Sequence, residues 1–178
     1  YSNLQFYAPL LYWINRQEKD CVILAKDESK NSPKLNGLIL AFTHCNVYDA
    51  NGNYSIVPSD RVYHNYLVRT LFDGATSQNV YKYLEKPKIA PRHYLSSNWK
   101  ELLNVKDFPD VPNNLEERSK KLPEDYKKFF AQDLKSELKK YRLDYIIIEG
   151  KAEGRVADLI KDLDLVYTLG NISVYQFK

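Results

Sequence analysis

The sequence of 178 residues contains no methionine, not even at position 1. It also contains no apolar run that approaches the roughly 20 residues needed to cross a bilayer. Its first residues lack the pattern of a secretory signal peptide. Because Tyr1 and the residues after it already lead into a helical pattern, we expect a domain cut from a longer protein. Removal of a natural start is the alternative.

Cysteine is scarce, and Cys21 and Cys45 are too few for the disulfide framework of a small secreted protein. Cys21 opens an apolar run and Cys45 lies inside a strand-like one. Each is therefore interpreted as a small buried hydrophobic residue. A bond between the two is possible if their strands are neighbours.

A strong charge of either sign is also missing, since 26 basic residues against 23 acidic ones leave a net charge of +3. Nucleic-acid binding requires a concentrated basic surface, and the basic residues outside 120–140 are scattered among acids. We therefore expect no nucleic acid as a partner. The lysines within 120–140 are interpreted as the solvated face of a helix, with contact to an anionic lipid surface as the alternative.

Sequence motifs of catalysis and cofactor binding are absent. There is no GxGxxG or GxxxxGK[ST] phosphate loop, no GxSxG nucleophile turn and no HxxxH or HxH metal spacing. The DxD spacing from Asp162 to Asp164 precedes a predicted strand, whereas ligands usually bind at the opposite strand ends. The sequence therefore predicts no cofactor, no metal ion and no catalytic residue in this chain.

The clearest positive feature is a helical pattern that leads into a buried strand. Apolar residues recur at helical spacing from Phe130 to Tyr141, in a helix expected to begin at Pro123, and residues 145–148 form a continuous apolar run. Residues 4–25 repeat this order, with a helical pattern over 4–17 before an apolar run. A helix that feeds a buried strand through a short connection is half of an α/β layered domain.

The end of the chain predicts a β-hairpin, because strand-like runs at 164–169 and 172–177 flank a Gly-Asn dipeptide. The proline-containing stretch at about 85–122 is interpreted as an irregular insertion, since too little chain follows it for a second core. Together these patterns predict a single α/β domain over residues 1–178. Its fold is expected to be a three-layer, Rossmann-like, mainly parallel sheet with a C-terminal antiparallel hairpin.

Candidate ligand-binding residues follow from this fold, because ligands of open α/β sheets usually bind at the carboxyl ends of the strands. The polar loop after the first predicted strand carries Asp27 and Glu28, and His44 and Asp49 lie around the next strand-like run. Lys151 lies in a glycine-bounded loop after the isoleucine-rich strand, before a helix N-terminus that could receive an anion. The alternative for these loops is an ordinary surface connection.

Four phrases of the sequence together resemble a known group of proteins. They are FYAPLLYWINRQEKDCVILA (6–25), LILAFTHCNVYD (38–49), LKKYRLDYIII (138–148) and LVYTLGNISVYQF (165–177). Similar phrases occur in the extracytoplasmic C-terminal domains of polytopic membrane proteins that resemble lipid-linked-sugar glycosyltransferases, the protein mannosyltransferase and oligosaccharyltransferase-like group. The resemblance spans most of the chain except 85–114, and its motifs are hydrophobic and structural.

This resemblance implies a membrane-anchored protein, with the present chain as a soluble domain on the extracytoplasmic side. The implied partners are the transmembrane part of the same chain and a carbohydrate or protein acceptor. In that group the catalytic acids lie in loops of the membrane part, so no catalytic residue carries over. We therefore expect a non-catalytic accessory domain. The alternatives are a stand-alone small-ligand-binding domain or enzyme with its site at the strand ends, and an interaction module without a small ligand.

Overall fold

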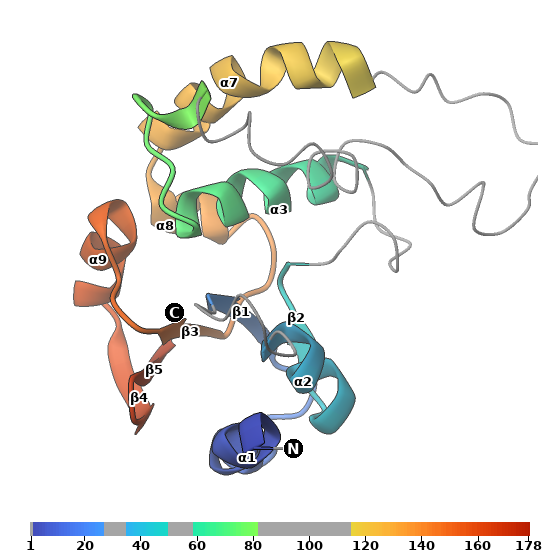
Figure 1. Cartoon of the computed structure of the whole chain (residues 1–178), viewed down its shortest axis with the longest axis vertical. Helices are drawn as coiled ribbons and strands as arrows, with labels where there is room; N and C mark the ends of the chain where they lie inside the picture. Colours follow the sequence, from blue (N-terminus) through green and yellow to red (C-terminus); the bar gives the residue numbers. More distant parts are fainter. Residues whose placement is uncertain (1, 27–34, 50–58, 82–114) are drawn as a thin grey trace, which may run out of the picture. The chain divides into compact units, whose positions relative to one another are not determined.

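The computed structural model describes residues 2–26, 35–49, 59–81 and 115–178, which are coloured in Figure 1. The chain forms two compact units: unit 1 comprises residues 1–48 and 134–178, and unit 2 comprises residues 49–133. Most of the insertion predicted at 85–122 lies outside the described residues. The prediction of a single domain therefore stays a prediction.

A five-stranded sheet forms the centre of unit 1, with the strand order β2-β1-β3-β5-β4. The strands are β1 (Val22–Lys26), β2 (Asn46–Val47), β3 (Tyr145–Glu149), β4 (Asp164–Leu169) and β5 (Ile172–Gln176). β1 pairs in parallel with β2 and β3, whereas β5 pairs antiparallel with β3 and β4. The α/β class is confirmed, but the sheet is mixed, and the prediction of a mainly parallel sheet is wrong.

The mixed pairing follows from the burial of β3. Ile146 and Ile147 are fully buried, so the backbone groups on both edges of this strand need protein partners. β1 occupies one edge, and β5, with its own fully buried Ile172 and Val174, occupies the other. The hairpin thus joins the sheet beside its central strand instead of extending a parallel sheet at the rim.

β4 and β5 confirm the predicted C-terminal hairpin, in which Thr168 pairs with Ser173 and Leu169 pairs with Ile172. Gly170 lies in the turn with a φ of 58°, a left-handed conformation that glycine adopts without steric strain. The Gly-Asn dipeptide therefore ends β4 and reverses the chain, as the sequence predicts.

Helices α1 (Ser2–Ile14) and α2 (Leu35–Phe42) share a hydrophobic core with one face of the sheet. The core includes Tyr7, Leu10 and Ile14 from α1, Leu35 and Ile39 from α2, and Ile23, Ile147 and Val174 from the strands. α1 agrees with the helix predicted over residues 4–17. Its buried side chains recur at three- and four-residue spacing, which keeps them on the helix face that meets the sheet.

The strand side chains that alternate with this core point to the opposite face of the sheet. Leu24, Ile146 and Ile148 are buried there as well. Helices α8 (Leu134–Leu138) and α9 (Gly154–Lys161) contact each other, and Figure 1 shows α9 on the side of the sheet away from α1. Burial on both faces explains why residues 145–148 are a continuous apolar run instead of an alternating one.

Unit 2 is built on α3 (Ser59–Phe72) and α7 (Leu115–Ala131), which lie side by side in Figure 1. The Tyr126 hydroxyl donates a hydrogen bond to the Ala75 carbonyl at 2.8 Å. The Tyr63 hydroxyl donates to the Asp125 carboxylate at 2.8 Å. These two hydrogen bonds join α7 to α3 and to the turn that follows it.

The helix predicted to begin at Pro123 begins earlier. α7 starts at Leu115, so residues 115–122 are helical instead of irregular, and Pro123 lies inside the helix. The buried side chains of α7 include Leu122, Tyr126 and Phe129. Their three- and four-residue spacing continues across the proline, and this packing outweighs the one backbone hydrogen bond that a proline removes.

The same predicted helix also ends earlier than its apolar stripe. The Gln132 N–H bonds to the Phe129 carbonyl at 3.1 Å, in a tighter turn than that of an α-helix. α8 then begins at Leu134 and belongs to unit 1. The apolar spacing conceals this break, because Leu134 and Leu138 stay in helical phase with the residues before it.

Candidate functional site

The residues predicted to bind a ligand do not gather at one place in the described part of the chain. Asp27 and Glu28 lie outside the described residues. His44 lies just before β2, at the amino ends of the parallel strands, whereas Lys151 follows β3 at their carboxyl ends. Asp49 belongs to unit 2. The three described residues therefore have separate surroundings.

The carboxyl ends of β1 and β3 are joined by hydrogen bonds. The Lys26 ammonium donates to the Lys151 carbonyl at 3.1 Å. The Tyr7 hydroxyl, from α1, lies 3.1 Å from one carboxylate oxygen of Glu149 and 3.2 Å from the other. The side chain of Lys151 is exposed. This edge thus carries the exposed side chain of Lys151 and, two residues earlier in the chain, a carboxylate that is hydrogen-bonded to α1.

Asp49 forms a largely buried ion pair within unit 2. Its carboxylate accepts a hydrogen bond from Nη1 of Arg69 at 2.8 Å, and its side chain is only 7% exposed. Arg69 also lies 3.7 Å from the carboxylate of Asp73, the residue that immediately follows α3. A buried carboxylate needs such a partner to remain charged, so Asp49 has a structural role as the partner of Arg69.

His44 lies in the bend between α2 and β2 and contacts the end of α1 and the loop that follows it. Its backbone N–H donates to the Asn15 side-chain carbonyl at 3.2 Å. Its Nε2 atom lies 3.0 Å from the Glu18 carbonyl oxygen. Because a carbonyl oxygen can only accept, Nε2 carries the proton in this contact.

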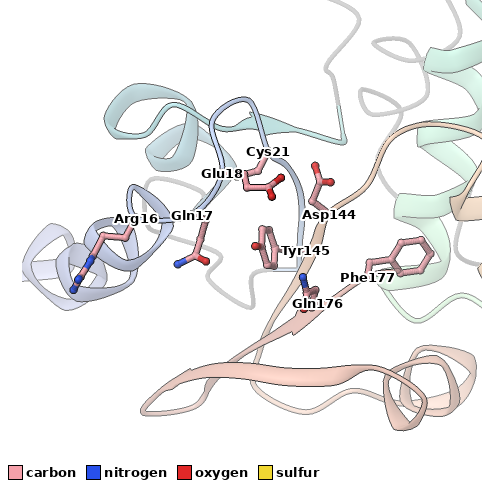
Figure 2. Close-up of a pocket in the computed structure, with 8 residues that line it drawn as sticks. All are labelled: Arg16, Gln17, Glu18, Cys21, Asp144, Tyr145, Gln176 and Phe177. Carbon is pink, nitrogen blue, oxygen red and sulfur yellow. The ribbon is translucent and has the colours of Figure 1, made fainter.

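A cavity of about 340 Å³ opens at the amino ends of β1 and β3, beside this loop (Figure 2). Its lining consists of Arg16, Gln17, Glu18, Cys21, Asp144, Tyr145, Gln176 and Phe177. In the view of Figure 2, the Glu18 and Asp144 side chains lie above the Tyr145 ring, with Gln17 and Gln176 on either side of it. This amino-edge pocket was not predicted, because ligands of open α/β sheets were expected at the carboxyl ends of the strands.

The lining of the amino-edge pocket offers both hydrogen-bond donors and hydrogen-bond acceptors. Oδ2 of Asp144 accepts the Val22 N–H at 2.8 Å and Nε of Arg142 at 2.9 Å, so this carboxylate anchors the start of β1. Burial raises the pKa of the Tyr145 phenol, and the negative charges of Asp144 and Glu18 raise it further. Tyr145 therefore stays protonated at neutral pH and can donate a hydrogen bond. Such a lining suits a small polar molecule.

A disulfide bond joins Cys21 to Cys45 at the side of this pocket. Both residues are buried, as the sequence predicts, and the bond that was only possible from the sequence is present. Cys21 immediately precedes β1 and Cys45 immediately precedes β2. The bond thus fastens the short edge strand β2 to β1.

His44 completes a group of three potential metal ligands with the two cysteines. One ligand atom from each of Cys21, His44 and Cys45 can be chosen so that all three lie within 4.8 Å of one another. The spacing of the histidines in the sequence does not reveal this group, because it depends on a cysteine 23 residues before His44 in the chain, which the β1–β2 pairing brings close.

Neither the search for membrane-spanning helices nor the comparison with known proteins assigns this chain to a family. Among the residues that the structure describes, no helix has the length and apolar character needed to span a membrane. No protein-family model, no curated protein and no solved structure matches the chain. The function must therefore be argued from the residues themselves.

Proposed function

We propose that the chain is an extracytoplasmic, non-catalytic accessory domain of a membrane-anchored protein that resembles lipid-linked-sugar glycosyltransferases. The observation that carries the proposal is the disulfide between Cys21 and Cys45, which lies in the core of unit 1. Disulfides form and persist in oxidising compartments and are rare in the cytoplasm. The bond therefore supports the location that the resemblance implies.

The positions of the four resembling phrases support the same proposal. They coincide with α1 and β1, with α2 and β2, with the end of α8 and β3, and with the β4–β5 hairpin. All four thus fall on the helices and strands that build unit 1. We take unit 1 as a Rossmann-like, three-layer scaffold and unit 2 as an insertion between β2 and α8. The transmembrane part of the same chain is then the partner of this scaffold.

The amino-edge pocket is the place where such a domain would contact an acceptor, either a carbohydrate or a polypeptide. The carboxylate of Glu18, the amides of Gln17 and Gln176 and the phenol of Tyr145 are suited to hydroxyl and amide groups. The same pocket favours a second candidate function, a stand-alone domain that binds a small polar ligand. A concave site with convergent polar groups is the usual place for one.

The coding sequence upstream of Tyr1 distinguishes the two candidates. An accessory domain of a polytopic membrane protein requires several apolar segments of about 20 residues before it, because each must cross the bilayer. A start codon shortly before Tyr1, with no such segment, would contradict the accessory role. The stand-alone domain would then be the remaining candidate.

Thermal unfolding tests the pocket in either case. A ligand that binds the folded chain raises its Tm, so monosaccharides, oligosaccharides and nucleotides can be screened by this shift. We expect Glu18→Gln together with Gln176→Leu to abolish a shift produced at the pocket. The matched control is Lys139→Gln, which alters an exposed residue outside the pocket lining. A shift that the pocket variant retains would exclude the pocket as the binding site.

A further inference from the structure

The group formed by Cys21, His44 and Cys45 offers a chemistry that the accessory role does not use. Their potential ligand atoms lie within 4.8 Å of one another. We propose that, when the Cys21–Cys45 bond is reduced, these three residues bind a thiophilic divalent cation of the Zn²⁺ class. This inference stands apart from the proposed function, since it concerns the reduced chain in any compartment.

The donor set is the first argument for such a site. Two cysteine thiolates and one histidine nitrogen are ligands that Zn²⁺ prefers, and three protein ligands leave a fourth, tetrahedral position for water. Carboxylate-seeking cations such as Mg²⁺ have no preference for this set. The group therefore selects a soft or borderline cation.

The backbone keeps the two cysteines together without the disulfide. The Asn46 N–H donates to the Cys21 carbonyl at 2.7 Å, and Val22 pairs with Asn46 in the parallel ladder. The Cα atoms of Cys21 and Cys45 are 4.6 Å apart. Reduction therefore leaves two thiols that the strand pairing still holds as neighbours.

The hydrogen bond that the His44 ring makes is the second argument. Its Nε2 atom faces the Glu18 carbonyl at 3.0 Å and carries the proton there. In the neutral ring Nδ1 then holds the lone pair that a cation can accept. Metal-binding histidines commonly donate their other N–H to a backbone carbonyl or a carboxylate, which fixes the tautomer and the ring orientation. The Glu18 carbonyl supplies this support.

The amino-edge pocket lies beside the group, because Cys21 is part of its lining, although the side chains of Cys21 and Cys45 are buried. A dithiol reductant gives two electrons to the disulfide and is itself converted to a cyclic disulfide, while both cysteines become thiols. On binding, the two thiols release their protons and the thiolates bond to the cation.

Titration of the whole chain with Co²⁺ tests the proposal, with Zn²⁺ as competitor. The chain is reduced with a dithiol, the reductant is removed without oxygen, and Co²⁺ is added. We expect a thiolate-to-cobalt charge-transfer band that Zn²⁺ abolishes, and no band from the oxidised chain. His44→Gln should weaken binding by about tenfold or more, because loss of a ligand should cost at least as much as loss of an outer-shell partner, which costs about 10–100-fold. Cys21→Ser with Cys45→Ser should remove the band.

Lys19→Gln is the matched control, because Lys19 follows Glu18, whose carbonyl contacts His44, and because Lys19 is exposed and offers no comparable ligand. Both His44→Gln and Lys19→Gln keep the cysteines, so their folding can be checked by circular dichroism in the oxidised form. Should the reduced chain unfold, Zn²⁺ is expected to restore the fold and raise Tm. A reduced chain with neither a charge-transfer band nor a Zn²⁺-dependent rise in Tm would overturn the proposal. A band of unchanged affinity in His44→Gln would overturn the three-residue site.

Discussion

Removal of the Cys21–Cys45 bond is expected to destabilise unit 1 by an amount that can be worked out from its position. The bonded residues are 24 positions apart in the sequence. The bond therefore closes a loop of about 25 residues in the unfolded chain, and the loop-entropy relation gives about 3.5 kcal/mol at 25 °C. This is a large part of the stability of an ordinary domain, which is about 5–15 kcal/mol.

The loss of stability should appear first at the sheet edge formed by β2. β2 is only two residues long, and its ladder consists of Val22 opposite Asn46 and Ile23 opposite Val47. The Tyr48 N–H adds a hydrogen bond to the Ile23 carbonyl at 2.8 Å. These few hydrogen bonds still hold β2 beside β1 without the disulfide, but so short a ladder opens more often, and hydrogen exchange of these amides should accelerate more than exchange within β3.

Tryptophan fluorescence provides an assay specific to unit 1. The sequence contains two tryptophans, Trp13 and Trp99, so Trp99→Phe leaves Trp13 as the sole reporter. The Trp13 ring lies 5.0 Å from the ring of Tyr167 and 5.7 Å from that of Tyr145, between centroids. With a urea slope of about 2 kcal/mol/M, Cys21→Ser with Cys45→Ser should lower the midpoint by about 1.7 M.

The reduced parent chain is the control for this comparison, because it loses the bond but keeps both sulfur atoms. We expect it to match the double serine variant closely. An unchanged midpoint in both would refute the loop-entropy reasoning. A fall in the serine variant alone would assign the effect to the loss of sulfur packing.

Three further predictions concern the core, the buried ion pair and the alkaline limit of stability. Ile147→Ala should lower the free energy of unfolding of unit 1 by about 2–5 kcal/mol, measured by Trp13 fluorescence, because Ile147 is fully buried. The exposed Val166→Ala should change it by less than about 0.5 kcal/mol, and equal effects would contradict this account of the core. Arg69→Met should destabilise unit 2 by about 1–3 kcal/mol in urea unfolding followed by circular dichroism, because it removes a cation that pairs with the buried Asp49 carboxylate. Adding Asp49→Asn should recover part of this loss, and no recovery would contradict the pairing. The folded-state pKa of Tyr145 lies above its unfolded value, so its neutral phenol stabilises the fold below a pH of about 10 and this contribution is lost as pH rises through the folded pKa. Tyr145→Phe should therefore lessen the alkaline fall of the urea midpoint, and an identical fall would refute this assignment.

The features predicted correctly from the sequence are those that depend on neighbouring residues. The isoleucine run of β3 and the Gly-Asn turn of the hairpin each lie within a few residues, so composition and spacing reveal them. The pairing of β5 with β3 is not of this kind. The strand that pairs with β5 is the buried strand that still has an unpaired edge, and no local sequence pattern shows which strand that is. The predicted parallel sheet failed for this reason.

The amino-edge pocket lay beyond prediction for the same physical reason. Its lining comes from the loop between α1 and β1, the start of β3 and the end of β5, three segments that only the sheet topology brings together. Each segment alone looks like a polar connection. The disulfide was an intermediate case: the two cysteines are visible in the sequence, but their bonding depends on β1 and β2 being neighbours.

The redox state of Cys21 and Cys45 in living cells tests the proposed extracytoplasmic location most directly. Cells that produce the protein would be quenched with acid, and free thiols would be labelled with a heavy maleimide before and after reduction. The account predicts no labelling before reduction and labelling of both cysteines after it, because the bond forms in an oxidising compartment. Complete labelling of both thiols before reduction would contradict it.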